Sequence, residues 1–181
     1  SEMSLWKSWS LSRSLPRNQL KMPIISTPTS VDGIVIEISV TKSITGDELV
    51  AAIKERLPKV KVGPGTEPDN EMGPLITREH RDKVASYLDS GKEQGAEVVA
   101  DGRETAPDGD GFFLGVSLLD KVTPEMDAYK DEIFGPVLSV VRAGTYGEAI
   151  KLVNENQYGN GVAIFTRDGG VARQFQHEVE V

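Results

Sequence analysis

The segment 131–136, Asp-Glu-Ile-Phe-Gly-Pro, holds the side chains best suited to binding a small molecule. The Glu132 carboxylate can accept hydrogen bonds from a diol such as a ribose, and the Phe134 ring can pack against a flat ring. Gly135 allows a close backbone approach and Pro136 fixes its own φ, so a rigid loop could hold both side chains. The alternative is a solvated acidic turn, in which Glu132 caps the turn into the next strand and Phe134 belongs to the core.

Few other residues offer catalytic or metal-binding chemistry. The sequence has no cysteine, which excludes disulfides, thiolate metal sites and a thiol nucleophile within it. The two histidines, His80 and His177, lie far apart and neither belongs to a His-x-x-x-His pair. We expect both on the surfaces of helices, and we expect no metal site.

Composition narrows the class of protein. The 181 residues suit one domain, and a net charge of −8 repels phosphate backbones, which argues against nucleic-acid binding. No apolar run approaches the roughly 18 residues of a membrane helix, and residues 1–20 lack the apolar core of a signal peptide. We therefore expect a cytoplasmic protein that binds neither nucleic acid nor membrane.

The composition changes near residue 43. Residues 1–42 carry five basic and three acidic side chains, a charge of +2. Because the net charge of the whole chain is −8, residues 43–181 carry −10. Prolines at 16, 23 and 28 interrupt this first part. We expect residues 1–30 to be a poorly specified arm and 31–42 to include a strand. The sequence thus predicts an atypical N-terminal arm, 1–42, and a domain over 43–181.

Helical and strand patterns alternate from residue 43 onward. This alternation is typical of an α/β domain, with parallel strands joined by right-handed crossovers and helices on both faces of the sheet. Asp47 and Thr77 are expected helix caps, and Gly95 is an expected helix stop. The expected helices cover 47–57, 78–94, 145–156 and 170–178, and the expected strands cover 59–63, 96–100, 112–119, 137–141 and 162–166.

The segment around Glu132 resembles the Glu-Ile-Phe-Gly-Pro motif of the aldehyde dehydrogenase superfamily. The similarity covers about 44–181. Within the superfamily, 61–68 and 158–166 most resemble the methylmalonate-semialdehyde dehydrogenase branch. Further segments resemble the superfamily in the same order and spacing: 72–76, 111–114, 122–126 and 172–175.

This resemblance implies a fold, two cofactor contacts and a reaction. The fold is an incomplete three-layer α/β/α catalytic domain. Glu132 matches the glutamate that hydrogen-bonds the nicotinamide ribose of NAD, and Phe134 matches the aromatic residue beside the nicotinamide. Members of the branch oxidise malonate or methylmalonate semialdehyde with NAD, lose carbon dioxide and pass the acyl group to coenzyme A. The resemblance assigns no catalytic residue to this chain.

The chain also departs from the superfamily. The dinucleotide-binding domain has no counterpart here, no Gly-x-Gly-x-x-Gly fingerprint occurs, and the nucleophilic cysteine is missing. Because the reaction begins with thiolate attack on the aldehyde, we expect the chain alone to be inactive. The alternative is a truncated, non-catalytic subunit that docks on full-length dehydrogenase chains or on itself. A plain α/β scaffold is a third reading, against which the ordered motifs argue.

Overall fold

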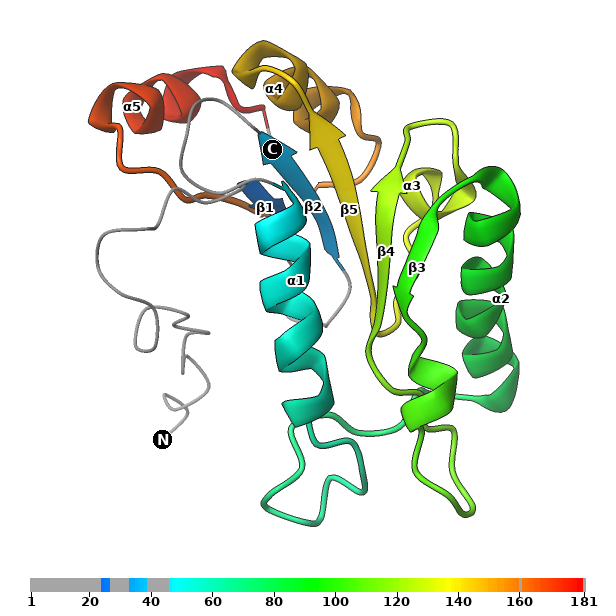
Figure 1. The fold of residues 1–181 in the computed structure, drawn as a ribbon. Coiled ribbons are helices and arrows are strands. Elements are labelled where there is room, and N and C mark those ends of the chain that lie inside the picture. Colours follow the sequence, from blue (N-terminus) through cyan, green and yellow to red (C-terminus); the bar gives the residue numbers. More distant parts are fainter. Residues whose placement is uncertain (1–23, 27–32, 39–45, 160, 181) are drawn as a thin grey trace.

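The computed structural model describes residues 24–26, 33–38, 46–159 and 161–180 (Figure 1). One mixed sheet and its covering helices make up the described part. In chain order the elements are β1 (Ile24–Ser26), β2 (Gly33–Ile38), α1 (Gly46–Arg56), η2 (Leu57–Lys59), α2 (Arg78–Gln94), β3 (Glu97–Ala100), η3 (Gly102–Thr105), β4 (Ser117–Val122), α3 (Asp127–Lys130), β5 (Val137–Ala143), α4 (Tyr146–Glu155), β6 (Val162–Ile164) and α5 (Gly169–Glu178).

The six described strands lie in the order β3-β4-β5-β2-β1-β6. The central strands β4, β5 and β2 are parallel, but β3 runs antiparallel to β4, and β1 runs antiparallel to both β2 and β6. The expectation of a wholly parallel sheet is therefore wrong at the edges. Between β3 and β4 the chain forms only the short 3-10 helix η3 and no crossover helix, so β4 returns beside β3 in the opposite direction.

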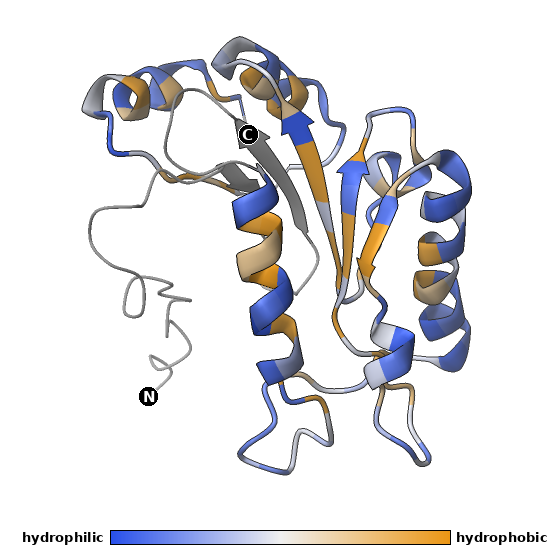
Figure 2. Cartoon of the chain, in the orientation of Figure 1, coloured by the Kyte–Doolittle hydropathy of each residue, from blue (hydrophilic) through white to orange (hydrophobic). Residues whose placement is uncertain are grey.

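Alternate residues of the central strands face two separate apolar clusters. Leu119 and Val137 belong to the large cluster, which α2, α3, α4 and α5 cover. Leu118 and Val140 belong to the small cluster, where they meet Leu49 of α1. Figure 2 shows hydrophobic colour concentrated in β4, β5 and the helix sides that meet them. The expected three-layer α/β/α architecture is confirmed.

Helix α2 forms where the sequence predicted it. The Thr77 hydroxyl accepts a hydrogen bond from the His80 amide at 3.1 Å, and Gly95 ends the helix with a left-handed φ of 106°. Val84 and Leu88 on its inner face are fully buried. The caps and the apolar periodicity therefore place this helix firmly against the sheet.

Three local expectations are wrong. Asp47 does not precede α1 as a cap but lies in its first turn, where its carboxylate accepts from Arg142. Residues 59–63 form no strand, because Pro58 favours the 3-10 helix η2 and only an isolated bridge follows. The strand expected at 112–119 begins at Ser117 instead.

Two strands come from the segment expected to be an arm. β2 confirms the strand expected within 31–42 and pairs in parallel with β5 over its full length. β1 lies inside the part expected to be poorly specified and joins β2 to β6. The rest of 1–42 lies outside the described residues, so the boundary near residue 43 stays a prediction. Among the described helices, none is long and apolar enough to cross a membrane.

Candidate functional site

Residues 131–136, here called the Phe134 turn, connect α3 to β5. The Asp131 amide closes α3 by donating to the Asp127 carbonyl at 2.9 Å, and the Pro136 carbonyl accepts from the Ser117 amide at 2.7 Å. Ile133 is 7% exposed and anchors the turn in the large cluster. Helix α3 and the parallel pair β4–β5 thus fix both ends of the turn.

Phe134 is the most unusual residue of this turn. Its φ is 52°, in the left-handed region that bulky residues rarely adopt, and its side chain is 57% exposed. The alternative in which Phe134 belongs to the core is therefore wrong. Strained backbone beside an exposed aromatic ring is a recurrent mark of binding sites.

Glu132 is also presented outward. Its side chain is exposed, and no hydrogen bond or ion pair joins it to the rest of the described residues. A carboxylate that merely capped the turn would accept from a neighbouring backbone amide, and the described part of the turn shows no such bond. The two predicted site residues thus lie together on one turn, with their polar and aromatic groups available to a ligand.

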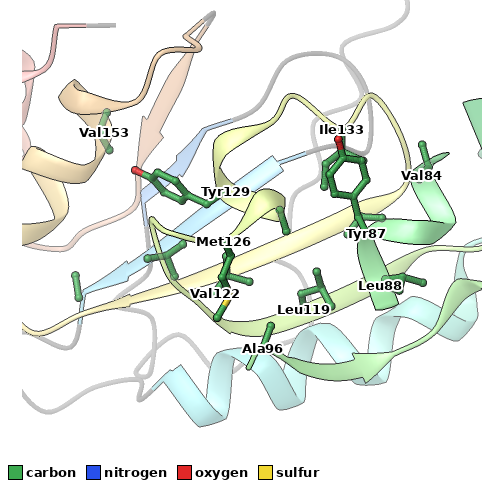
Figure 3. Packing of buried hydrophobic residues seen from close by; sticks show 14 of the residues in the cluster. Val84, Tyr87, Leu88, Ala96, Leu119, Val122, Met126, Tyr129, Ile133 and Val153 are labelled. Atoms are coloured by element: carbon green, nitrogen blue, oxygen red, sulfur yellow. The ribbon is translucent and has the colours of Figure 1, made fainter. Parts of the chain in front are cut away.

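One face of α2 runs along the Phe134 turn. His80, Val84 and Tyr87, spaced i, i+4 and i+7, form this face, which we call the α2 stripe. His80 Nε2 lies 2.7 Å from the Phe134 carbonyl oxygen, and the Tyr87 hydroxyl donates to Asp131 Oδ2 at 2.7 Å. Figure 3 shows Val84 and Tyr87 beside Ile133 of the turn.

Val84 completes the stripe by packing against Gly135. A Cβ at Gly135 would fall within 2.6 Å of the Val84 Cγ2 methyl and closer still to Cγ1. The absence of a side chain at Gly135 therefore allows α2 to approach the turn. A fully buried Val84 means that this contact has little freedom to rearrange.

The environment of Tyr87 keeps its hydroxyl protonated. Burial and the hydrogen bond to Asp131 raise the pKa of Tyr87 to about 12, with a smaller contribution from the charge of Asp127. At neutral pH the phenol therefore donates to the Asp131 carboxylate, which can only accept when ionised. This bond ties the start of the turn to α2.

Other large apolar side chains are also exposed in the described part of the chain. Ile76, just before α2, is 83% exposed, and Tyr158, after α4, is 44% exposed. Gln157 donates to the Lys130 carbonyl at 2.7 Å, which ties the segment after α4 to the end of α3. The described residues contain no group of three or more His, Asp or Glu side chains able to hold a metal ion.

Comparison with known proteins decides the family. The profile of the aldehyde dehydrogenase family matches residues 35–181. The chain belongs to the aldehyde dehydrogenase family. The match begins within β2, nine residues before the start of the similarity expected at residue 44.

Relatives of this aldehyde dehydrogenase chain include malonate- and methylmalonate-semialdehyde dehydrogenases. It is 53% identical over 137 residues to malonate-semialdehyde dehydrogenase of Pseudomonas aeruginosa, covering 75% of this chain and 28% of that protein. It is 46% identical over 129 residues to the acylating mitochondrial methylmalonate-semialdehyde/malonate-semialdehyde dehydrogenase of Bos taurus, covering 70% of this chain and 24% of that protein.

A solved structure from Sinorhizobium meliloti 1021 shares the fold at a TM-score of 0.73 and 45% identity. It carries the name methylmalonate-semialdehyde dehydrogenase and contains NAD, and the match covers 80% of this chain and 30% of that one. This aldehyde dehydrogenase chain thus spans about a quarter to a third of the relatives that it matches.

Sequence reasoning found the exposed pair on the turn and missed what holds it. Glu132 and Phe134 stand together as expected, although their cofactor role remains a prediction. His80 and His177 both lie on helices, as expected, and His177 is exposed. His80, however, is half-buried and contacts the turn, and the sequence pattern assigned Tyr87 no part in holding the turn. Their i, i+7 spacing, on the face that carries Val84, was the available signal.

Proposed function

We propose that this chain is part of the catalytic domain of an NAD-dependent malonate- or methylmalonate-semialdehyde dehydrogenase. In this proposal Glu132 and Phe134 contact the nicotinamide half of NAD. The observation that carries it is the Phe134 turn, where a carboxylate without a partner among the described residues stands two positions before an exposed, left-handed aromatic residue. Identity of 53% to a malonate-semialdehyde dehydrogenase supports the substrate class.

The two side chains fit the group they would hold. The Glu132 carboxylate can accept two hydrogen bonds from adjacent ribose hydroxyls, and the Phe134 ring offers a flat apolar surface of the size of a nicotinamide. When bound, NAD accepts the hydride that leaves the substrate. This chain would orient the nicotinamide ribose and exclude water from one side of the nicotinamide ring.

The remaining steps need groups that this sequence does not contain. The reaction of the branch forms a thioester on a cysteine and passes the acyl group to coenzyme A, with loss of carbon dioxide. The name of the bovine relative includes the word acylating, which supports coenzyme A as the acceptor. With no cysteine among its 181 residues, this chain alone should produce no NADH from either semialdehyde, with or without coenzyme A.

A chimaera tests the cofactor role. The Pseudomonas aeruginosa enzyme would carry residues 46–180 of this chain in place of its own matching segment. Removing one charged hydrogen bond costs about 1.5–3 kcal/mol, so Glu132→Gln should slow hydride transfer about tenfold or more without lowering the melting temperature. Glu125→Gln, an exposed carboxylate on the preceding loop, is the matched control and should leave the rate unchanged.

A loss of stability without a loss of rate would contradict the cofactor role of Glu132. If Glu132→Gln lowers the melting temperature sharply and leaves hydride transfer in the folded enzyme unchanged, Glu132 stabilises the turn and does not bind the cofactor. The chain alone supplies a second check by calorimetry. Lacking the adenosine and pyrophosphate contacts, it should bind NAD no more tightly than about 1 mM.

Exposed apolar side chains favour a second candidate, a subunit that docks on full-length dehydrogenase chains or on itself. Ile76, Phe134 and Tyr158 are large, exposed and hydrophobic, and exposed apolar surface favours association. Co-expression with the full-length Pseudomonas aeruginosa enzyme and capture on a tag tests this candidate. Retention that Ile76→Ser weakens would support docking, whereas no retention would contradict it.

A further inference from the structure

The three contacts of the α2 stripe hold different parts of the Phe134 turn. Tyr87 holds the Asp131 side chain, and Val84 packs against Gly135. Of these three residues, only His80 bonds to the main chain of the turn, at the carbonyl oxygen of the left-handed residue Phe134. This carbonyl belongs to the peptide unit between Phe134 and Gly135, so a bond to it fixes the direction in which the backbone leaves Phe134.

We propose that His80 is a positioning residue that holds the Phe134 turn in its left-handed conformation. Resting on the proposed function, the consequence is that His80 presents Glu132 and Phe134 to the nicotinamide half of NAD without touching it. A carbonyl oxygen can only accept, so the Nε2 atom of His80 must carry the hydrogen. The bond therefore fixes a hydrogen on Nε2 as well as the shape of the turn.

The helix fixes His80 before the imidazole reaches the turn. The His80 amide donates to the Thr77 hydroxyl, which places His80 in the first, capped turn of a 17-residue helix. Four and seven residues later, Val84 and Tyr87 are held in the large cluster. The imidazole thus extends from a firmly packed helix to the strained backbone of the turn, and within the described residues no other hydrogen bond from α2 reaches the backbone around Phe134.

Backbone relaxation by NMR on the full 181-residue chain tests the proposal. In the wild-type chain, the amides of Glu132 and Phe134 should have order parameters of about 0.85, which is typical of rigid backbone. His80→Leu removes the donor and should lower both values below about 0.6. His80→Gln retains an N–H donor and should restore order. His177→Leu changes the exposed histidine of α5 and is the matched control.

Two results would overturn the positioning role. One is a His80→Leu variant whose turn stays as ordered as in the wild type. The other is a ring ¹⁵N spectrum of wild-type His80 with the hydrogen on Nδ1 alone, because Nε2 then has nothing to donate. The second measurement needs no variant, so it decides the matter even if His80→Leu does not fold.

Titration with nicotinamide mononucleotide separates this role from the proposed function. Shifts of the Glu132 and Phe134 amides that vanish in His80→Leu and return in His80→Gln would support both. A different result is that the turn loosens in His80→Leu while the wild-type chain shows no such shifts up to about 10 mM ligand. This result would support the positioning role. At that concentration binding tenfold weaker than about 1 mM would half-saturate the site, so this chain alone would then not hold the nicotinamide half, and the rate of Glu132→Gln in the chimaera decides the cofactor contact.

Discussion

The two faces of the sheet are held by different forces. In the part of the chain whose side chains are described, the face under α2, α3, α4 and α5 carries the large cluster, whose 17 buried residues extend from Val84 to Phe175. Among the same residues, the face under α1 carries a small cluster with four buried members. The Phe134 turn is anchored to the first face through Ile133, Val84 and Tyr87. A strained turn can persist only where its surroundings are rigid, which explains its place on the larger cluster.

Charges take a larger part on the α1 face. Asp120, only 3% exposed, accepts two hydrogen bonds from Arg142, at 3.0 Å and 2.6 Å, and Arg142 also donates to Asp47 of α1 at 2.9 Å. This network joins β4, β5 and the start of α1. Packing thus dominates on one face, whereas a buried ion pair supports the other.

The largest expected effect comes from two neighbouring leucines of β4. Leu119 and Leu118 are both 0% exposed but belong to the large and the small cluster, respectively. Leu119→Ala should cost about 4 kcal/mol of unfolding free energy, because the surrounding cluster cannot collapse into the cavity. Leu118→Ala should cost about 2.5 kcal/mol, because α1 can move inward towards the smaller cluster.

Urea denaturation of both variants measures this difference, with each midpoint converted through a common slope. The two substitutions remove the same atoms from adjacent positions of one strand, so each controls for the other. Equal losses, or a larger loss for Leu118→Ala, would show that the two faces are equally rigid and would refute the contrast drawn between them.

The sequence predicted the packed face better than the charged one. Thr77, Gly95 and the apolar period of 78–94 are local signals, and they placed α2 correctly at both ends. The ion pair between Asp120 and Arg142 joins residues 22 positions apart, and Asp47 is 95 positions from Arg142. No local pattern marks such partners, so Asp47 was taken for a helix cap.

Asp120→Asn should have the next largest effect, and it should depend on pH. Burial alone would raise the pKa of Asp120, but the hydrogen bonds from Arg142 and from the Lys121 amide outweigh burial and lower it. At pH 7 the substitution should cost about 2–3 kcal/mol, because it weakens a charged bond and leaves Arg142 with exposed Asp47.

The sign of the pH dependence follows from the lowered pKa. The stabilisation by Asp120 is fully present above its unfolded pKa of about 3.9 and is lost as pH falls through the lower folded value. The gap between wild type and Asp120→Asn should therefore narrow below about pH 4. Denaturation curves from pH 7 to pH 3 measure it, and a gap that stays constant over this range would contradict the role of the ionised carboxylate.

The candidate site shows the same division between local and distant signals. The motif around Glu132 is contiguous in sequence, so its exposed carboxylate and ring could be predicted together. The left-handed φ of Phe134 could not, because a bulky residue gives no local reason for it. The contact that explains it comes from α2, where His80, 54 positions before Phe134, contacts the Phe134 carbonyl oxygen.

Gly135→Ala should have the smallest effect of the three and acts where the turn meets the packed face. The new methyl would overlap both Val84 methyls, and overpacking of this kind costs about 1–3 kcal/mol. Gly147→Ala is the matched control, because a Cβ there meets no atom within 4 Å and Gly147 lies inside α4. It should stabilise the chain by up to about 1 kcal/mol.

A double-mutant cycle shows whether the loss at Gly135 comes from Val84. In the Val84→Ala background the overlap disappears, so Gly135→Ala should then be at least about 1 kcal/mol less costly than in the wild type. Amide shifts of Glu132 and Phe134 should move in Gly135→Ala and return towards wild type in the double variant. Additive losses and unchanged shifts would mean that α2 does not press on the turn at this point, and the rigidity of the Phe134 turn would then depend on His80, Tyr87 and the buried Ile133.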